Sequence, residues 1–201
     1  MPARPHIVAR QLACRRGNRR LFAGVDLTLA RGTITWLRGA NGSGKTSLMR
    51  ILAGLSRPES GEVERHGDLI YVAHGNALKD DLKLVEAVAF LAHLHGVPGA
   101  RQRAARALDT LGIASRAHAF VRTLSQGQRR RGALARLALD DTPRAWILDE
   151  PFDALDTDGI ARLAGLIEAH AARGGSVLLT SHQALAVAGA REFELQPWSK
   201  P

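Results

Sequence analysis

One glycine-rich segment, Gly39–Thr46, limits the possible folds of this chain more than any other feature. It reads Gly-Ala-Asn-Gly-Ser-Gly-Lys-Thr and fits the pattern G-x-x-x-x-G-K-[ST]. It stands between Thr33–Leu37, which we expect to be a strand, and Lys45–Leu55, which we expect to be a helix. Glycines let successive backbone N–H groups point at phosphate oxygens, and the start of a helix adds partial positive charge. The segment therefore predicts a phosphate-binding loop that holds a nucleotide.

The side chains of this loop have distinct expected roles. Lys45 would reach the β- and γ-phosphates, and the hydroxyl of Thr46 would bind Mg²⁺. The other candidate nucleotide-binding residues are Gly39, Ala40, Asn41, Gly42, Ser43, Gly44 and Ser47.

The composition excludes several classes of protein. Of the 201 residues 45% are hydrophobic, enough for a core, yet no uninterrupted apolar run approaches the ~20 residues of a membrane-spanning helix. The N-terminus lacks the apolar stretch of a secretory signal, so we expect the chain to stay in the cytosol. The single cysteine, Cys14, excludes a disulfide framework and a cysteine-rich metal site, and we expect it in the core.

The formal net charge of +9 has two interpretations. An excess of cations favours an anionic partner, which could be nucleic acid, nucleotide phosphate or the inner face of a membrane. Arginines that simply solvate the surface would give the same charge, so the charge alone does not identify a partner.

Apolar patterning predicts strands that alternate with helices. We expect strands at Ile7–Leu12, Val25–Leu29, Thr33–Leu37, Leu69–Val72, Trp146–Leu148, Val177–Leu179 and Phe193–Leu195. We expect helices at Lys45–Leu55, Leu84–Leu94, Arg101–Leu111 and Asp158–Ala172. This order indicates an α/β protein with a mainly parallel core sheet, an N-terminal antiparallel β portion and an inserted helical lobe.

Two turns are predicted near the phosphate-binding loop. Arg31-Gly32 predicts a hairpin-like entry from the strand Val25–Leu29 into Thr33–Leu37. Pro58–Gly61 predicts a turn that ends the unit containing the loop.

Two carboxylates follow the apolar strand Trp146–Leu148. A phosphate-binding loop that handles Mg-nucleotide needs acidic residues opposite it. Asp149 would hold Mg²⁺ directly or through water, and Glu150 would orient or deprotonate the attacking water. An apolar strand with an acidic end is common, and only its pairing with the loop makes this signal specific.

The segment between these two motifs carries a family resemblance. Leu124–Arg131, Leu-Ser-Gln-Gly-Gln-Arg-Arg-Arg, resembles the signature motif of ABC ATPases, with Gln126 where that family usually has glycine. Pro151–Asp156 resembles the D-loop, and Leu179–His182 resembles the strand that ends in the switch histidine. With five motifs in the family's order, the chain is identified as a member of the ABC nucleotide-binding family. The resemblance implies one P-loop NTPase domain over residues 1–201, with the helical lobe at about 76–127.

Membership implies a mechanism that spacing alone could not give. In this family two such domains pair head to tail and sandwich two ATP molecules. His182 would hydrogen-bond the γ-phosphate and help to hold Glu150 and the attacking water in place. Asp156 would connect the two ATP sites across the dimer. The signature residues expected to contact the ATP of the other copy are Ser125, Gln126, Gly127 and Gln128.

The chain departs from the family pattern at two places. His74 takes the position of a usual glutamine, where it could contact Mg²⁺ or water, or act as a hinge that couples the lobe to a permease. The aromatic that usually stacks on adenine is missing, and Arg15-Arg16-Gly17 stands there. Arg16 could stack on the base through its guanidinium, or it could be a solvated surface charge.

Two other groups of residues invite functional interpretation. Arg129–Arg131 resembles a nucleic-acid patch in isolation, but it falls where the signature helix normally carries basic residues. His93 and His95 suggest a metal or haem site, yet their spacing places them on different helix faces, so exposed histidines are the better interpretation.

The resemblance favours transport over a soluble function. Soluble family members usually have two linked cassettes or a long coiled coil between loop and signature, and this chain has neither. A transport role implies a separate integral membrane permease, with the chain peripheral at the cytoplasmic face of the bacterial inner membrane and no nucleic-acid partner.

Four stretches narrow the kind of transporter. They are Leu21–Val25, Gly54–Pro58, Ala145–Phe152 and Thr180–Gln183, and together they resemble the ATP-binding subunits of the haem exporter complex of cytochrome c maturation. This implies ATP, Mg²⁺ and, indirectly, haem-pathway proteins. The alternatives are the ATPase subunit of another small exporter, for a lipid or drug, and a nucleic-acid-linked ABC ATPase.

Overall fold

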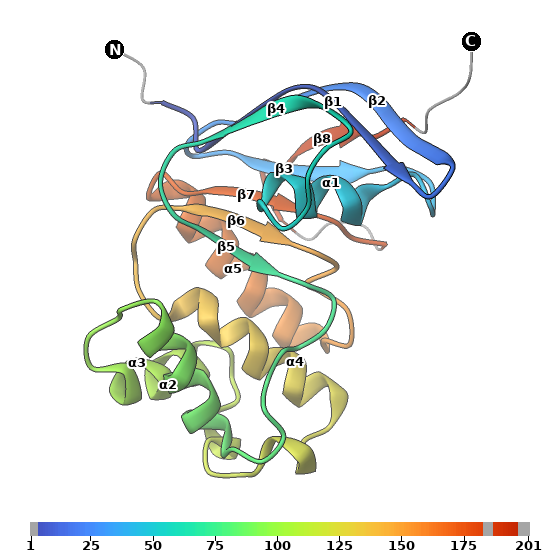
Figure 1. Ribbon diagram of the computed structural model, residues 1–201. Helices are drawn as coiled ribbons and strands as arrows, with labels where there is room; N and C mark the ends of the chain where they lie inside the picture. Colours follow the sequence, from blue (N-terminus) through green and yellow to red (C-terminus); the bar gives the residue numbers. More distant parts are fainter. Residues whose placement is uncertain (1–3, 183–186, 197–201) are drawn as a thin grey trace. The chain divides into compact units, whose positions relative to one another are not determined.

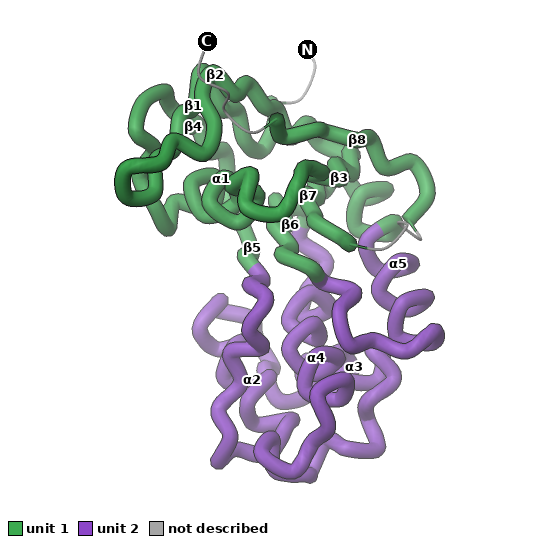
Figure 2. The backbone as a smooth tube through the Cα atoms, turned by 90° about the vertical axis from the view of Figure 1, so that its right-hand side faces the viewer, with its two compact units in different colours: residues 1–71, 143–150, 168–201 green, residues 72–142, 151–167 purple. Residues whose placement is uncertain are grey.

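The structure, a computed structural model, describes residues 4–182 and 187–196 and divides into two compact units (Figure 2). Unit 1 comprises residues 1–71, 143–150 and 168–201, and unit 2 comprises residues 72–142 and 151–167. The expected helical lobe, residues 76–127, falls inside unit 2. The assignment of residues 1–201 to one domain stays a prediction.

An antiparallel sheet forms the N-terminal part of unit 1. It contains β1 (Ile7–Arg16), β2 (Arg19–Leu29) and β4 (Ser60–Arg65) in the order β2-β1-β4. The turn predicted at Pro58–Gly61 is wrong in part, because β4 already begins at Ser60. Its sequence hides the strand, since Val63 is the one partly buried residue among exposed polar neighbours.

A five-stranded sheet carries the strands that lead into the predicted site (Figure 1). Its order is β5 (Leu69–Val72), β6 (Ala145–Leu148), β7 (Ser176–Leu179), β3 (Ile34–Arg38) and β8 (Arg191–Glu194). β3 pairs with β7 and β8 in parallel, and β6 pairs with β7 in parallel. Every residue of β6 and β7 is buried, as expected for central strands covered on both faces. The α/β prediction with a mainly parallel core sheet is confirmed.

The hairpin-like entry predicted at Arg31-Gly32 is wrong. β2 pairs with β1 from one end to the other, and β3 belongs to the other sheet. Gly32 adopts φ +74° and donates its N–H to the carbonyl of Gly175 at 2.8 Å, which turns the chain toward β7. The physical reason is the apolar character of β3, whose buried side chains favour a central position.

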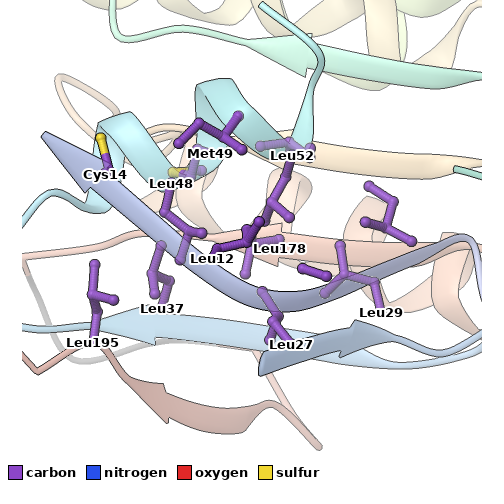
Figure 3. Packing of buried hydrophobic residues seen from close by; sticks show 14 of the residues in the cluster. Leu12, Cys14, Leu27, Leu29, Leu37, Leu48, Met49, Leu52, Leu178 and Leu195 are labelled. Atoms are coloured by element: carbon purple, nitrogen blue, oxygen red, sulfur yellow. The ribbon is translucent and has the colours of Figure 1, made fainter. Parts of the chain in front are cut away.

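The core of unit 1 lies between its two sheets and the helix α1 (Lys45–Leu52) (Figure 3). Leu12 and Leu29 of the antiparallel sheet pack in one cluster with Leu48 of α1 and Leu178 of β7, all fully buried. The predicted end of α1 at Leu55 is too late. Gly54, at φ +78°, closes the helix in a Schellman motif, with Leu55 N–H bonded to the Arg50 carbonyl at 2.8 Å.

Unit 2 is built from helices. They are α2 (Leu84–Leu94), α3 (Ala100–Thr110), α4 (Gln126–Leu134), much of α5 (Thr157–Ala172) and 3-10 turns at Ala114–Arg116, Val121–Thr123 and Ala135–Ala138. α2 packs against α3, and both contact the turn that continues α4. No helix within residues 4–182 and 187–196 has the length and apolar character required to span a bilayer.

Candidate functional site

The predicted phosphate loop connects β3 to α1, and two of its glycines are required by close packing. Gly39 has φ +142°, and a Cβ there would lie 2.6 Å from the Leu195 carbonyl oxygen. Gly44 has φ +103°, and a Cβ there would lie 3.0 Å from the Phe22 ring. Any side chain at these two positions would push the loop away from the sheet behind it, so the pattern read from the sequence has a steric basis.

The start of α1 offers donors to an anion. Its N-cap, Gly44, has no side chain to accept from the first N–H groups, and the first turn holds no acidic residue. Thr46 is exposed in this turn, and Ser47 is partly buried. Unsatisfied N–H groups and the helix dipole together favour phosphate at this place.

Other loop residues also fit a bound phosphate. Lys45 Nζ donates to the carbonyls of Gly39 at 2.7 Å and Ala40 at 3.3 Å, which holds the ammonium over the loop. Ser43 Oγ is buried, and it has no hydrogen-bond partner in the part of the chain that the structure describes. A buried hydroxyl without a partner is costly, so a ligand oxygen there would be stabilising. Asn41 and Gly42 lie exposed at the loop surface.

The two predicted acidic residues follow β6 directly, and one threonine hydroxyl binds the side chain of the first and the backbone of the second. Leu148 pairs with Leu179, so the residues just beyond β6 lie beside those just beyond β7. The buried Thr180 hydroxyl accepts from the Glu150 N–H at 2.8 Å and donates to Asp149 Oδ1 at 3.1 Å. Sequence reasoning gave Thr180 no role, although strand register would have placed a hydroxyl there.

Glu150 is held against His182 by two contacts. The His182 N–H donates to Glu150 Oε2 at 3.1 Å, and His182 Nε2 lies 3.5 Å from Glu150 Oε1. The Glu150 side chain is 10% exposed and that of His182 is 59% exposed. Glu150 has φ +48°, a left-handed conformation that is costly for a residue with a Cβ. The carboxylate is thus fixed beside an accessible imidazole, as an acid–base pair requires.

An open cavity of about 460 Å³ extends from the loop to His182, the partner of Glu150. Lys45, Gly39 and His182 all contribute to its lining, together with Trp36 and Arg38. The structure therefore brings the predicted loop lysine and the predicted switch histidine to one hollow within unit 1.

The two acidic residues could bind Mg²⁺ together with oxygens of the nucleotide phosphates. Within the described residues there is no group of three or more His, Cys, Asp or Glu that could form an all-protein metal cage. Mg²⁺ does not need one, because it is usually bound by one or two protein oxygens together with phosphates and water. Asp149 is buried at the strand end. Burial raises the pKa of Tyr71, and the nearby charge of Asp149 adds to this effect.

The signature segment opens α4 in unit 2. The Ser125 hydroxyl accepts from the Gln128 N–H at 3.3 Å, and Gln128 Oε1 accepts from the Ser125 N–H at 3.1 Å, which forms a capping box. A Cβ on Gly127 would lie 2.6 Å from the Ala154 carbonyl oxygen, so glycine is required there. Gln126 is exposed in the first helical turn, and the departure from glycine therefore meets no steric obstacle.

A second open cavity, of about 680 Å³, lies beside the signature in unit 2. Ser125, Gly127, Gln128 and Asp156 line it, so four of the predicted cross-dimer residues share one hollow. Asp156 accepts from the Gly159 N–H and pairs with a buried arginine, and these contacts lower the pKa of its carboxyl.

His74 and Arg16 are both surface residues. The His74 side chain is 71% exposed, with Nδ1 3.6 Å from Asp153 Oδ2. Arg16 is exposed at the end of β1, opposite Arg19 of β2. The sequence analysis did not identify Glu59, which forms ion pairs with Arg15 and Arg20 of the same hairpin. These arginines stabilise its negative charge and lower its pKa to about 2. The roles of His74 and Arg16 stay predictions.

Two minor predictions about solvent exposure are confirmed. Cys14 is a buried core residue. His93 and His95 are exposed at the end of α2, and His93 contacts its own helix at the Ala89 carbonyl.

The chain matches known proteins along most of its length. Residues 22–153 match the family model described as ABC transporter. The chain is 43% identical to the cytochrome c biogenesis ATP-binding export protein CcmA of Dechloromonas aromatica, over 94% of this chain and 98% of that protein. It is 44% identical to the protein of the same name from Methylococcus capsulatus, over 91% and 94%.

A solved structure supports the fold independently. An ATP-binding subunit of an ABC transporter superposes with a TM-score of 0.79 at 24% identity, over 88% of this chain and 79% of that chain. From its sequence relatives and this fold, the chain belongs to the ABC transporter family, in the group of cytochrome c biogenesis ATP-binding export proteins.

Proposed function

We propose that this ABC ATPase is the ATP-hydrolysing subunit of the haem exporter complex of cytochrome c maturation. Two copies would act with a separate membrane permease, peripheral to the cytoplasmic face of the inner membrane. The observation that carries the hydrolytic role is the buried Glu150 carboxylate, held against His182 at the hollow that Lys45 also lines. The curated relatives, named for cytochrome c biogenesis and export, support the pathway.

The loop and the start of α1 would bind the triphosphate. The N–H groups from Gly39 to Ser47 would surround it, and Lys45 would exchange its two carbonyl partners for β- and γ-phosphate oxygens. Ser43 Oγ would gain the partner that it lacks within the described residues. Thr46 and Asp149 would hold Mg²⁺, which would neutralise charge on the phosphates.

Glu150 and His182 would handle the attacking water. Glu150 would accept its proton, because a carboxylate fixed in position next to an imidazole can orient and deprotonate a water molecule. His182 would hydrogen-bond the γ-phosphate through its exposed ring. Thr180 would keep Asp149 and Glu150 in register through its two hydrogen bonds.

A second copy would complete each site. Ser125 and Gly127, with Gln126 and Gln128 beside them, would contact the γ-phosphate on the loop of the other copy. The capping box supports this role, since it fixes Ser125 at the open N-terminus of α4. Asp156 lines the same hollow as Ser125 and would connect the two sites.

Affinity capture from membranes tests the pathway. Tagged protein would be purified from solubilised membranes, with mass spectrometry and a haem absorbance scan of the eluate, and the Lys45→Ala variant would be the matched nucleotide-free control. A small permease together with cytochrome c maturation proteins is the expected result. A permease of another pathway would refute the haem role, and ribosomes or DNA would refute transport.

A further inference from the structure

The arginine run of the signature helix is largely inside unit 2. Arg130 is 2% exposed and Arg131 is 9% exposed, although both belong to the stretch that resembles a nucleic-acid patch in the sequence. Burial of a guanidinium is costly unless hydrogen bonds compensate for the lost water, so we expect hydrogen-bond partners for these side chains.

Arg130 binds the backbone of the segment that follows β5. Its Nη1 donates to the Ala73 carbonyl at 3.1 Å and to the His74 carbonyl at 3.2 Å. Arg136, in the turn that continues α4, donates from Nη2 to the Asn76 carbonyl at 3.5 Å. Three carbonyls of residues 73–76 therefore face guanidinium groups of one continuous helical stretch.

Residues 73–76 have no helix or strand of their own to fix them. Three of their carbonyls accept from these arginines, whereas the His74 side chain is exposed, with its Nδ1 3.6 Å from Asp153 Oδ2. The backbone of His74 is therefore held by Arg130, while its imidazole stays at the surface, where a partner could contact it.

Arg131 makes a similar set of contacts with the residues around the start of α5 and with the end of α3. It donates to Asp158 Oδ2 at 2.9 Å and to the Leu111 carbonyl at 3.1 Å, and it pairs with Asp156. Neighbouring residues of α4 thus hold two separate loops, one containing His74 and the other containing Asp156. A movement of α4 would be passed to both loops, because planar guanidinium groups with several bonds hold their partners at a fixed angle.

We propose that Arg130 is a positioning residue that transmits nucleotide capture at Ser125 to the segment Ala73–Asn76 and so to the exposed His74. This rests on the proposed function, since it requires that α4 responds to ATP held by a second copy. Both hydrogen bonds leave from Nη1, whose two N–H donors have fixed directions in the guanidinium plane. The ammonium of a lysine rotates and fixes no such directions, so the arginine itself matters.

Hydrogen exchange with mass spectrometry on the full chain tests this transmission. The Glu150→Gln chain, which we expect to bind ATP without hydrolysing it, would be compared with and without Mg-ATP. It would be studied alone and combined with Arg130→Met, Arg130→Lys or the control Arg103→Met. Arg103 is an exposed arginine of α3, and its side chain makes no hydrogen bond or ion pair within the described residues. The readouts are the peptides that cover residues 73–77 and 125–134, the dimer fraction in sedimentation and the melting temperature.

ATP should slow exchange in both peptides of the Glu150→Gln chain and of its Arg103→Met control. With Arg130→Met the signature peptide should still respond, while the response of residues 73–77 should fall roughly five-fold, within the range of measured coupling energies. Arg130→Lys should give an intermediate response, and it serves as the test if the methionine variant does not fold.

Two results would overturn the proposal. An unchanged response of residues 73–77 in both Arg130 variants would show that the arginine does not transmit the signal. Equal loss of response in both peptides, together with a lower melting temperature, would show a general structural role. If the Glu150→Gln chain neither dimerises with ATP nor responds at residues 125–134, the ATP-sandwich function itself fails, which distinguishes the two failures.

Discussion

Replacing Thr180 with valine removes the hydroxyl that links the two carboxylate residues and keeps the volume of the side chain. Thr180 is fully buried, so water cannot substitute for the lost group. The Glu150 N–H would lose its acceptor at 2.8 Å, and Asp149 would lose a donor at 3.1 Å. Glu150 already has an unfavourable backbone conformation, at φ +48°, and this acceptor helps to hold it.

The magnitude follows from these two contacts. A hydrogen bond to a charged group contributes about 1.5–3 kcal/mol, and a buried N–H left without a partner costs about 1–3 kcal/mol. Because losses above about 4 kcal/mol are exceptional for one substitution, we expect the free energy of unfolding to fall by about 3 kcal/mol. Displacement of the catalytic carboxylate by even ~1 Å should lower kcat by roughly 100-fold.

The assay compares Thr180→Val with Thr180→Ser, which keeps the hydroxyl. Urea unfolding followed by circular dichroism would give the stability difference, and phosphate release at saturating ATP would give kcat. The serine variant should stay within about 1 kcal/mol of the parent chain. A valine variant as stable and as active as the serine variant would refute the bridging role of Thr180.

The remaining predictions concern four residues. Glu150→Gln should bind ATP with unchanged affinity in calorimetry and lose hydrolysis, and parent-like turnover would contradict its role as base. Lys45→Ala should abolish ATP binding in the same measurement, and retained affinity would argue against the loop assignment. Gly127→Ala should prevent the ATP-dependent dimer without loss of nucleotide binding, because its Cβ would meet the Ala154 carbonyl oxygen at 2.6 Å. Burial lowers the pKa of His170 to about 4, so the native state keeps this imidazole neutral while the unfolded chain takes up a proton near pH 6.5. The stability that the neutral His170 contributes is complete above pH 6.5, and the free energy of unfolding falls by about 3 kcal/mol at most as the pH falls toward 4. His170→Gln should therefore flatten the acid side of a plot of stability against pH.

Much of the site could be predicted from the sequence because its chemistry requires particular residue types at short spacing. Close packing permits only glycine at positions such as Gly39 and Gly44, so the loop motif can be recognised from the sequence alone. The α/β pattern was equally legible, because buried central strands such as β6 are continuous apolar runs.

What the sequence could not supply depends on contacts between distant residues. Thr180 gains its role only because β6 and β7 are neighbours, and Arg130 gains its partners only where residues 73–76 meet α4. The hairpin at Arg31-Gly32 was predicted wrongly because a local turn signal does not state which sheet the next strand joins. β4 was not predicted, because this mostly exposed strand has almost no alternation of apolar and polar residues.

The two tryptophans that the structure describes in full have different optical environments. Trp36 is partly exposed in the wall of the hollow that Lys45 and His182 line, with the Arg38 guanidinium 4.9 Å from its ring centre. Trp146 is buried and stacked on His170 at 3.6 Å. Nucleotide entry should therefore change the emission and acrylamide quenching of Trp36, while Trp146 stays shielded. In a chain with Trp198, which lies outside the described residues, replaced by phenylalanine, the protein would report its own ligand without any attached dye.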